Sequence, residues 1–470
     1  MYTVNGTFTS RWALATRVLT TGVRRSWRSE CPVRRGYSTL DETPAKMQQV
    51  PKASRASSLP RKAQFPGVTN SYFTNQLVIT TQMDPIATYQ VMDTDGVVQD
   101  AGQEPAVDQE LAVRIYREMI TMNAMDKVLY EAQRQGRISF YMTSYGEEAL
   151  IGSAAALHPT DVIFGQYREA GALLHRGFSL EAFMNQCYGN ALDLGKGRQM
   201  PVHYGTRDLH FVTISSTLAT QIPQASGAAY ALKLQGAAST GDAEPKRCVM
   251  CYFGDGAASE GDFHGALNMA ATMECPVIFF CRNNGFAIST PASEQYKGDG
   301  VASRGIGYGI DTIRCDGNDV WAVYNATKKA RELAVGHNRP VLIESLTYRI
   351  GHHSTSDDSS AYRSKSEVED WKRRDNPLTR LRKWLEAKGW WSPELETRAQ
   401  KDIRTNVLKA FAAAEKQLLP SPQETFADVY AAPEISPALA EQKAEVMGLV
   451  EKYPDYYKIH EFQKSGGSQS

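Results

Sequence analysis

The residues in this chain that could do chemistry begin with a short acidic motif. The apolar run "RCVMCYF" (247–253) ends at Gly254-Asp255-Gly256, and a helical pattern covers residues 260–273. Glycines let a backbone approach a bulky anion, and the first turn of the following helix offers free N–H groups and a partial positive charge. A carboxylate beside an anion needs a cation between them. Mg²⁺ suits this place because it combines one or two protein oxygens with phosphates.

A second polar motif follows the next apolar run, "PVIFFC" (276–281), which leads into Arg282 and the pair Asn283-Asn284. Ligands of parallel α/β sheets bind beyond the carboxyl ends of the strands, so we expect the two motifs to meet there. Asn284 can offer the cation a side-chain oxygen, Phe286 can offer a backbone carbonyl, and Arg282 can pair with a phosphate. Gly-Asp-Gly alone also fits a type I′ turn, but the two motifs together predict a Mg²⁺–phosphate site.

Short apolar, β-branched runs alternate with helical patterns between about residues 140 and 350. The runs are continuously apolar, which is typical of parallel strands that are covered on both faces. We therefore predict an α/β fold with a parallel sheet flanked by helices on both faces. The predicted strands are 161–165, 247–253, 276–281, 311–315 and 340–348, and the predicted helices are 220–235, 260–273 and 319–336.

The pattern on either side of this region is less regular. Apolar residues at helical spacing predict a helix over 109–135, and the charged stretch 366–418 is also expected to be helical. The run "QLVITT" (76–81) resembles a strand, and Asp95-Gly96 between apolar pairs resembles a hairpin turn.

The first 37 residues have the composition of a mitochondrial transit peptide, with seven arginines, no lysine and one acidic residue. A disordered basic tail is the alternative interpretation. The whole chain carries 52 basic and 52 acidic residues, so its charge gives no reason to expect nucleic acid or an anionic membrane as a partner. No uncharged apolar run of about 18 residues or more predicts a membrane span.

The cysteines do not indicate a disulfide or metal framework. Seven are present, an odd number in a long chain. Cys248 and Cys251 form C-x-x-C, but inside an apolar run, so we expect both to be buried in a strand rather than to form a redox pair. A zinc site is not expected, because the sequence has no second C-x-x-C.

The two polar motifs resemble the thiamine-diphosphate-binding motif, in which Gly-Asp-Gly precedes Asn-Asn by about 26 residues; here residues 257–282 separate them. Over roughly residues 75–460 the chain resembles the α subunits of branched-chain 2-oxo acid dehydrogenases, the decarboxylating E1 components. Pyruvate-specific relatives usually have one histidine where this chain has "IGHHSTSDDSS", so that segment favours the branched-chain family. The other segments that carry the resemblance are "FGQYREAG" (164–171), "GKGRQMPVHYG" (195–205), "FVTISSTLATQIPQA" (211–225) and "YRIGHHSTSDDSSAYRS" (348–364).

The resemblance implies a bound thiamine diphosphate, with Mg²⁺ held by Asp255, Asn284 and the backbone carbonyl of Phe286. Arg168 and Arg282 would pair with the diphosphate. The full set of residues implied to bind the cofactor is Gln166, Tyr167, Arg168, Ser216, Leu218, Gly254, Asp255, Gly256, Ala257, Glu260, Arg282, Asn284 and His353.

Two adjacent histidines, His352 and His353, follow the last predicted strand. Adjacent side chains on an ordered loop usually point in different directions, so at most one is expected to reach the cofactor. The resemblance implies that His353 is the catalytic residue, which moves protons near neutral pH. It also implies phosphorylation at Ser354 and Ser364, and a phosphate on Ser354 would add negative charge beside His353 and shut off the enzyme. Structural histidines and unmodified loop serines are the alternatives.

The segment "SSTLATQ" resembles a structural K⁺ site formed by Ser215, Thr217, Thr220 and Gln221. Relatives often have proline where this chain has Thr217. The site survives this change if the position donates a carbonyl, and it weakens if the rigidity of the loop matters. A Ser/Thr-rich turn without an ion is the alternative.

Thiamine enzymes also need a glutamate that contacts the aminopyrimidine, usually on a second domain of similar fold, and only one such domain fits in this chain. We therefore expect a β subunit, with an α₂β₂ heterotetramer that has the site at the interface. The resemblance further implies a small branched-chain 2-oxo acid from Leu, Ile or Val as substrate, and a lipoyl acyltransferase (E2) core that accepts the acyl group. It also implies a regulatory kinase and phosphatase, and a location in the mitochondrial matrix.

The chain is expected to comprise four segments. These are a transit peptide (1–37), an N-terminal arm and extension (38–108), the thiamine-diphosphate-binding domain (109–365), and a helical C-terminal region with a tail (366–470). Two other functions stay open on the sequence. One is a pyruvate-specific α subunit, and the other is a catalytically silent regulatory homologue.

Overall fold

The computed structural model describes residues 68, 71–81, 83–238, 246–430 and 436–463. The predicted transit peptide, residues 38–67 of the predicted N-terminal arm and extension, and the last residues of the chain lie outside this set. Within it, no helix is both long enough and apolar enough to cross a membrane.

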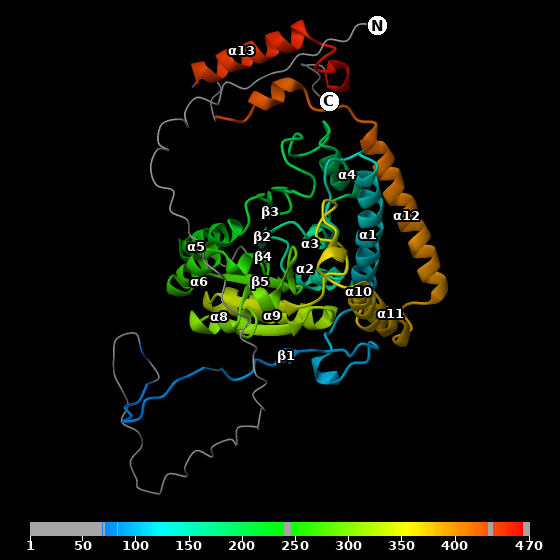
Figure 1. Cartoon of the computed structure of the whole chain (residues 1–470). Coiled ribbons are helices and arrows are strands. Elements are labelled where there is room, and N and C mark those ends of the chain that lie inside the picture. The colour runs from blue at the N-terminus through cyan, green and yellow to red at the C-terminus, as the bar shows by residue number, and fades with distance from the viewer. Residues whose placement is uncertain (1–67, 69–70, 82, 239–245, 431–435, 464–470) are drawn as a thin grey trace, which may run out of the picture. The chain divides into compact units, whose positions relative to one another are not determined.

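A seven-stranded sheet lies at the centre of the fold (Figure 1). All neighbouring strands in it are parallel, and the helices provide the crossovers that parallel neighbours require. The predicted α/β fold is therefore confirmed, and the five predicted strands correspond to β2, β4, β5, β8 and β9. In spatial order the strands are β1 (Thr88–Tyr89), β8 (Asp311–Asp316), β9 (Val341–Leu346), β5 (Val277–Asn283), β4 (Val249–Gly254), β2 (Val162–Phe164) and β3 (Phe211–Val212).

Both faces of the sheet are covered, as the continuously apolar strands predicted. In β4, Val249, Cys251 and Phe253 belong to one buried apolar cluster, whereas Met250 and Tyr252 belong to another on the opposite face. Successive side chains of a strand point to opposite faces, so a strand buried on both sides must be apolar throughout.

The C-x-x-C motif divides between these two clusters. Cys248 packs in one cluster and Cys251 in the other, and both side chains are fully buried. Burial raises the pKa of both thiols well above the ordinary value. The predicted burial of both cysteines is confirmed; Cys251 lies in β4, and Cys248 directly precedes it.

The predicted helices are also confirmed. The first begins where the Asp108 side chain accepts a hydrogen bond from Leu111 N at 2.8 Å, and it ends before Gly136, which has φ +74°. These are the side-chain N-cap and the left-handed glycine that commonly begin and end helices. The helices up to residue 337 are α1 (Gln109–Arg134), α2 (Ile151–Ala155), α3 (Ala170–His175), α4 (Leu180–Tyr188), α5 (Gln221–Ala238), α6 (Gly261–Thr272), α7 (Ala292–Gln295), α8 (Ala302–Gly307) and α9 (Val320–His337).

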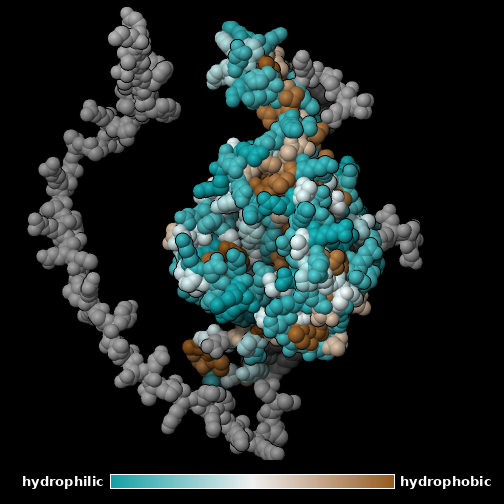
Figure 2. Space-filling model, turned by 90° about the vertical axis from the view of Figure 1, so that its right-hand side faces the viewer, coloured by the Kyte–Doolittle hydropathy of each residue, from teal (hydrophilic) through white to brown (hydrophobic). Residues whose placement is uncertain are grey.

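The C-terminal helices are α10 (Lys365–Arg374), α11 (Pro377–Ala387), α12 (Pro393–Glu415) and α13 (Pro437–Lys452). Helix α12 runs beside α1 (Figure 1) and buries a stripe that includes Ala399, Ile403 and Val407. This four-residue spacing places the apolar residues on one face of the helix. In Figure 2, which is seen from the α12 side, hydrophilic residues predominate and the hydrophobic ones form separate patches.

Of the two predictions before α1, one is wrong. Residues 76–81 form no strand, and Leu77 is 90% exposed. The turn at Asp95-Gly96 is confirmed, since Met92 and Val98 form an antiparallel bridge and Gly96 has φ +75°.

Candidate active site

The two predicted polar motifs meet at the carboxyl edge of the sheet. Strands β4 and β5 are neighbours, with Gly254 opposite Arg282 in the register. Just beyond them, a Cβ added to Gly256 would lie 2.8 Å from the Cβ of Ala287, so the two loops are in contact and a side chain at position 256 would clash. The motif therefore needs glycine here for close approach, as the sequence suggested.

Asp255 is buried at this edge and is only 1% exposed. Its carboxylate accepts a hydrogen bond from Gln295 Nε2 at 3.0 Å, and burial raises its pKa to about 6. The Asn284 side-chain oxygen accepts from Phe286 N at 3.2 Å. Within the described residues, no group of three or more His, Cys, Asp or Glu side chains could hold a metal by itself. A cation here would depend on mixed oxygen ligands and on its anionic partner.

Arg282 is paired more fully than predicted. Its Nη1 donates to Glu147 at 2.6 Å, and its Nε lies 2.8 Å from Glu169. Among the described residues neither Nε nor Nη2 of Arg282 makes a hydrogen bond, but Nε is in ion-pair contact with Glu169, whereas Nη2 has no such contact. The two carboxylates reduce the charge that Arg282 could present to a phosphate, so Nη2 is the one atom left to bind an anion.

The segment "FGQYREAG" packs against both motifs. Gln166 Oε1 accepts from Gly254 N at 2.7 Å, and the backbone N–H groups of Gln166 and Tyr167 both donate to Glu169 at 2.8 Å. The guanidinium groups of Arg168 and Arg282 lie 5.5 and 5.8 Å from the centre of the Tyr167 ring. Tyr167 therefore lies beside both arginines.

The His353 ring lies between two arginines. Its Nδ1 is 3.4 Å from Arg168 Nη2 and 3.5 Å from Arg349 Nη1, and its carbonyl accepts from Arg168 at 2.7 Å. Burial and these two cations lower the pKa of His353 to about 3. Nδ1 faces donors and so is an acceptor, which leaves the proton of the neutral ring on Nε2.

His352 points elsewhere. Its Nδ1 lies 3.0 Å from both the hydroxyl and the backbone nitrogen of Ser359, so this ring holds the loop together. The expectation that the two histidines diverge is confirmed. The described contacts connect only His353 with the arginines of the candidate site.

Hydrogen bonds from charged side chains hold the loop that carries His353 in place. Asp357 accepts from His353 N at 2.8 Å and from the Tyr362 hydroxyl at 2.6 Å, and Arg349 donates to that same hydroxyl at 2.7 Å. Arg363 adds hydrogen bonds to the backbone carbonyls of Arg349 and Gly351. Any change that breaks this network would displace His353.

The two predicted phosphorylation sites lie in different surroundings. Ser354 is only 7% exposed, and its hydroxyl accepts from Ser356 N at 3.2 Å. Ser364 is exposed at the start of α10, where its hydroxyl accepts from Glu367 N at 3.1 Å.

The predicted K⁺ segment forms a turn that leads into α5. Thr220 donates to the Thr217 carbonyl at 3.0 Å, and Gln221 donates to the carbonyl of Tyr252 in β4 at 3.1 Å. Ser215 is exposed at the beginning of this turn. The turn therefore lies next to β4, but the Thr217 carbonyl already accepts a hydrogen bond.

The remaining predicted cofactor residues are spread around these groups. Ser216 is bonded to His203 Nε2 at 2.8 Å, and Leu218 is 39% exposed. Ala257 is buried in the turn after Gly256, and Glu260 is exposed immediately before α6. No described contact links Glu260 with the arginines or with Asp255.

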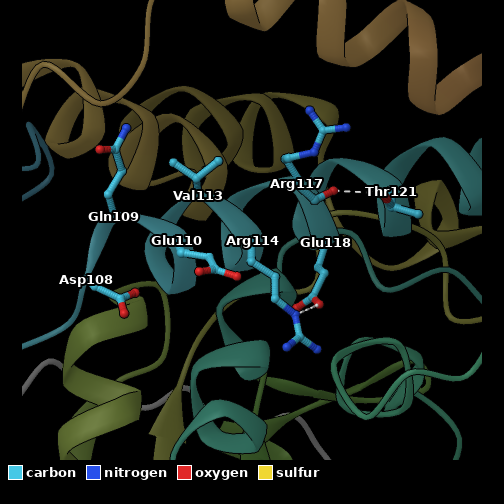
Figure 3. A pocket seen from close by; sticks show the side chains of 8 residues that line it. All are labelled: Asp108, Gln109, Glu110, Val113, Arg114, Arg117, Glu118 and Thr121. Atoms are coloured by element: carbon cyan, nitrogen blue, oxygen red, sulfur yellow. Dashed lines mark hydrogen bonds and ion pairs between the residues drawn. The ribbon is translucent and has the colours of Figure 1, made fainter.

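A separate surface hollow of about 860 Å³ runs along the first half of α1 (Figure 3). Its Arg114 and Glu118 pair at 2.8 Å. The residues that line it include none of the predicted site residues, so it does not compete with the carboxyl edge of the sheet as the candidate active site.

Comparison with known proteins identifies the family of this chain. Residues 116–423 match the family described as dehydrogenase E1 component. The chain belongs to this family. It is 55% identical over 410 residues to the mitochondrial 2-oxoisovalerate dehydrogenase subunit alpha of Bos taurus, across 87% of this chain and 88% of the relative. For the Homo sapiens protein of that name the identity is 55% across 87% and 90% of the two chains, and for the Mus musculus protein it is 53% across 92% and 94%.

The resemblance inferred from the sequence is therefore confirmed. The E1 family depends on thiamine diphosphate, and its α subunits generally pair with β subunits. The relatives are named as mitochondrial proteins, which supports a mitochondrial location for this E1 chain.

Sequence reasoning missed several residues of the candidate site. Glu147 and Glu169 are buried acceptors for the arginines, and Arg349, Asp357 and Tyr362 fix the loop of His353. The sequence offered a signal that Glu169 belongs to the site, because it directly follows Arg168. The signal for Glu147 was weaker: a pair of glutamates stands in the mostly uncharged stretch "SYGEEALIG".

Proposed function

We propose that the chain is the α subunit of a branched-chain 2-oxo acid dehydrogenase. The single observation that carries this is the meeting of buried Asp255 and Asn284 with Arg168 and Arg282 at the carboxyl ends of adjacent strands. The substrate class follows from the relatives, which are named for 2-oxoisovalerate and are more than half identical to this chain.

The residues at this edge fit a diphosphate with Mg²⁺. Asp255 has a neutral amide as its side-chain partner, and its pKa is raised by burial, so a neighbouring cation would stabilise its ionised form. Arg282 Nη2 is a buried donor without a partner among the described residues, a condition that a bound anion would relieve. We propose that Asp255, Asn284 and the Phe286 carbonyl hold Mg²⁺, and that Arg168 and Arg282 Nη2 bind phosphate oxygens.

When bound, thiamine diphosphate supplies a carbon nucleophile and an electron sink for decarboxylation. The protein must place the substrate, exclude water and handle protons. His353 would hold a proton at Nε2, because its Nδ1 faces Arg168 and Arg349. An anion against those two guanidinium groups would offset their charge and raise the pKa of His353 toward the range useful for proton transfer.

The remaining parts of the site would come from other chains or ions. The described residues form one large parallel sheet and so one domain of this fold. The glutamate that contacts the aminopyrimidine would therefore come from a β subunit, within an α₂β₂ heterotetramer. A lipoyl acyltransferase core would accept the acyl group in the mitochondrial matrix.

An ion and two regulatory enzymes complete the proposal. K⁺ bound by Ser215, Thr217, Thr220 and Gln221 would stabilise the turn beside β4. A kinase and a phosphatase would act on Ser354 and Ser364.

Turnover by the assembled α/β enzyme tests this function. With thiamine diphosphate, Mg²⁺ and the acyltransferase core, we expect 3-methyl-2-oxobutanoate to be used with a kcat/KM about tenfold or more above that for pyruvate. Its two extra methyl groups in an apolar pocket would give discrimination of this order. Preference for pyruvate would favour the pyruvate-specific alternative. No turnover of either acid would favour a catalytically silent homologue.

A further inference from the structure

The carboxylate of Glu147 contacts both halves of the candidate site. One oxygen, Oε1, accepts from Asn284 Nδ2 at 2.8 Å, and the other, Oε2, accepts from Arg282 Nη1 at 2.6 Å. The Nε of Arg168 lies 3.8 Å from Oε1. Glu147 is only 3% exposed, so these contacts are shielded from solvent. Its carboxylate thus links a predicted Mg²⁺ ligand to both predicted phosphate-binding arginines.

This contact determines which way the Asn284 amide faces. An ionised carboxylate only accepts hydrogen bonds, so the amide must turn its NH₂ group toward Glu147 and its oxygen away from it. That oxygen is on the side of the Phe286 backbone, where it accepts from Phe286 N at 3.2 Å. The other neighbours of this carboxylate are also donors, since Arg282 Nη1 lies 2.6 Å from Oε2 and Arg168 Nε lies 3.8 Å from Oε1, so Glu147 is surrounded by groups that require it to accept.

We propose that Glu147 is a positioning residue that orients the side-chain oxygen of Asn284 toward Mg²⁺. By binding both side chains, it also fixes the position of Asn284 relative to Arg282. This inference rests on the proposed function, because it assumes that Asn284 is a Mg²⁺ ligand. Groups that orient metal ligands without touching the metal commonly affect metal affinity strongly.

The variant Glu147→Gln reverses half of this arrangement. Glutamine keeps one acceptor oxygen and places an NH₂ group at the other position. Arg282 has only donors to offer, so the remaining oxygen faces Arg282 and the new NH₂ group faces Asn284. The Asn284 amide must then flip and turn its NH₂ group toward the metal position. We expect the Mg²⁺ concentration needed for half-maximal thiamine diphosphate binding to rise about 10- to 100-fold.

A neighbouring glutamate offers a matched control. Glu148 is also buried, at 2% exposure, and accepts from Gly146 N at 3.0 Å, but it makes no described contact with Asn284, Arg282 or Arg168. Glu148→Gln should therefore leave the Mg²⁺ requirement within about twofold of wild type, as expected for a change away from the ligands.

The double variant Glu147→Gln/Asn284→Asp provides a rescue. The carboxylate introduced at position 284 would accept from the new NH₂ group with one oxygen and present its other oxygen to Mg²⁺, and the total charge of the pair is unchanged. We expect the double variant to recover most of the Mg²⁺ affinity lost in Glu147→Gln. A merely structural role for Glu147 would not produce this recovery.

The measurement is a Mg²⁺ titration of thiamine diphosphate binding to the assembled α/β protein, followed by calorimetry and without substrate. If wild type binds no thiamine diphosphate, the proposed function itself fails. If wild type binds it and Glu147→Gln shows an unchanged Mg²⁺ requirement, only the role of Glu147 is overturned. If Glu147→Gln does not assemble, the double variant decides: Mg²⁺-dependent binding near the wild-type concentration supports the role, and failure to assemble or to bind overturns it.

Discussion

Replacing His353 by alanine is expected to lower turnover of 3-methyl-2-oxobutanoate by about 10²- to 10⁴-fold, the range that a positioned acid–base group contributes. The ring faces Arg168 and Arg349 through Nδ1 and would carry its proton on Nε2, the atom free to act on the reacting groups. The loop itself should persist in the variant, because Asp357 binds the backbone N–H of residue 353 rather than its ring. Steady-state kinetics of the assembled α/β enzyme measure the effect.

Two controls separate chemistry from assembly. Sedimentation or size-exclusion chromatography should show the same α₂β₂ assembly for His353→Ala and wild type. His337→Ala, at an exposed position at the end of α9, should retain turnover within about twofold, as is usual for surface changes. Near-normal turnover of His353→Ala would remove His353 from the proposed mechanism.

A negative charge at Ser354 is expected to inactivate the enzyme, whereas the same charge at Ser364 is not. Ser354 is 7% exposed and lies in the loop where His353 and Asp357 are hydrogen-bonded to each other. A carboxylate or phosphate there must either be buried near ionised Asp357 or push the loop out. We expect Ser354→Glu to lower turnover at least about 100-fold through displacement of His353, a group worth that much in proton transfer.

Ser364 provides the contrast within the same segment. It is the N-cap of α10 and is exposed, so a negative charge there is solvated and interacts favourably with the helix dipole. Ser364→Glu should stay within about twofold of wild-type turnover. Limited proteolysis provides a second test of loop displacement, because the rate of cleavage within 351–363 should rise for Ser354→Glu only. Equal turnover of the two variants would contradict this account of the loop.

The strand ends were predictable because their chemistry is carried by local sequence. Gly254-Asp255-Gly256 and Asn283-Asn284 each follow an apolar strand, and parallel strands bring their carboxyl ends to one edge. The same reasoning predicted the buried cysteines and the helices. It failed for residues 76–81, which form no strand, because a short apolar run does not by itself determine secondary structure.

The ionic partners were not predictable, since they depend on which distant segments the fold brings together. Arg282 meets Glu147, 135 positions earlier in the chain. Glutamate is usually exposed, and the one local signal, the glutamate pair in "SYGEEALIG", does not show that Glu147 meets Arg282. The burial of Ser354 likewise follows from the packing of its loop and could not be predicted from the neighbouring sequence.

The most direct test of the central claim is titration of the assembled α/β protein with thiamine diphosphate, with and without Mg²⁺, for wild type and Asp255→Ala. We predict Mg²⁺-dependent binding at one site per α chain in wild type, and an affinity at least about tenfold weaker in the variant, because a metal ligand is lost. Binding that is independent of Mg²⁺ and equally tight in Asp255→Ala would contradict a Mg²⁺–diphosphate site at the ends of β4 and β5.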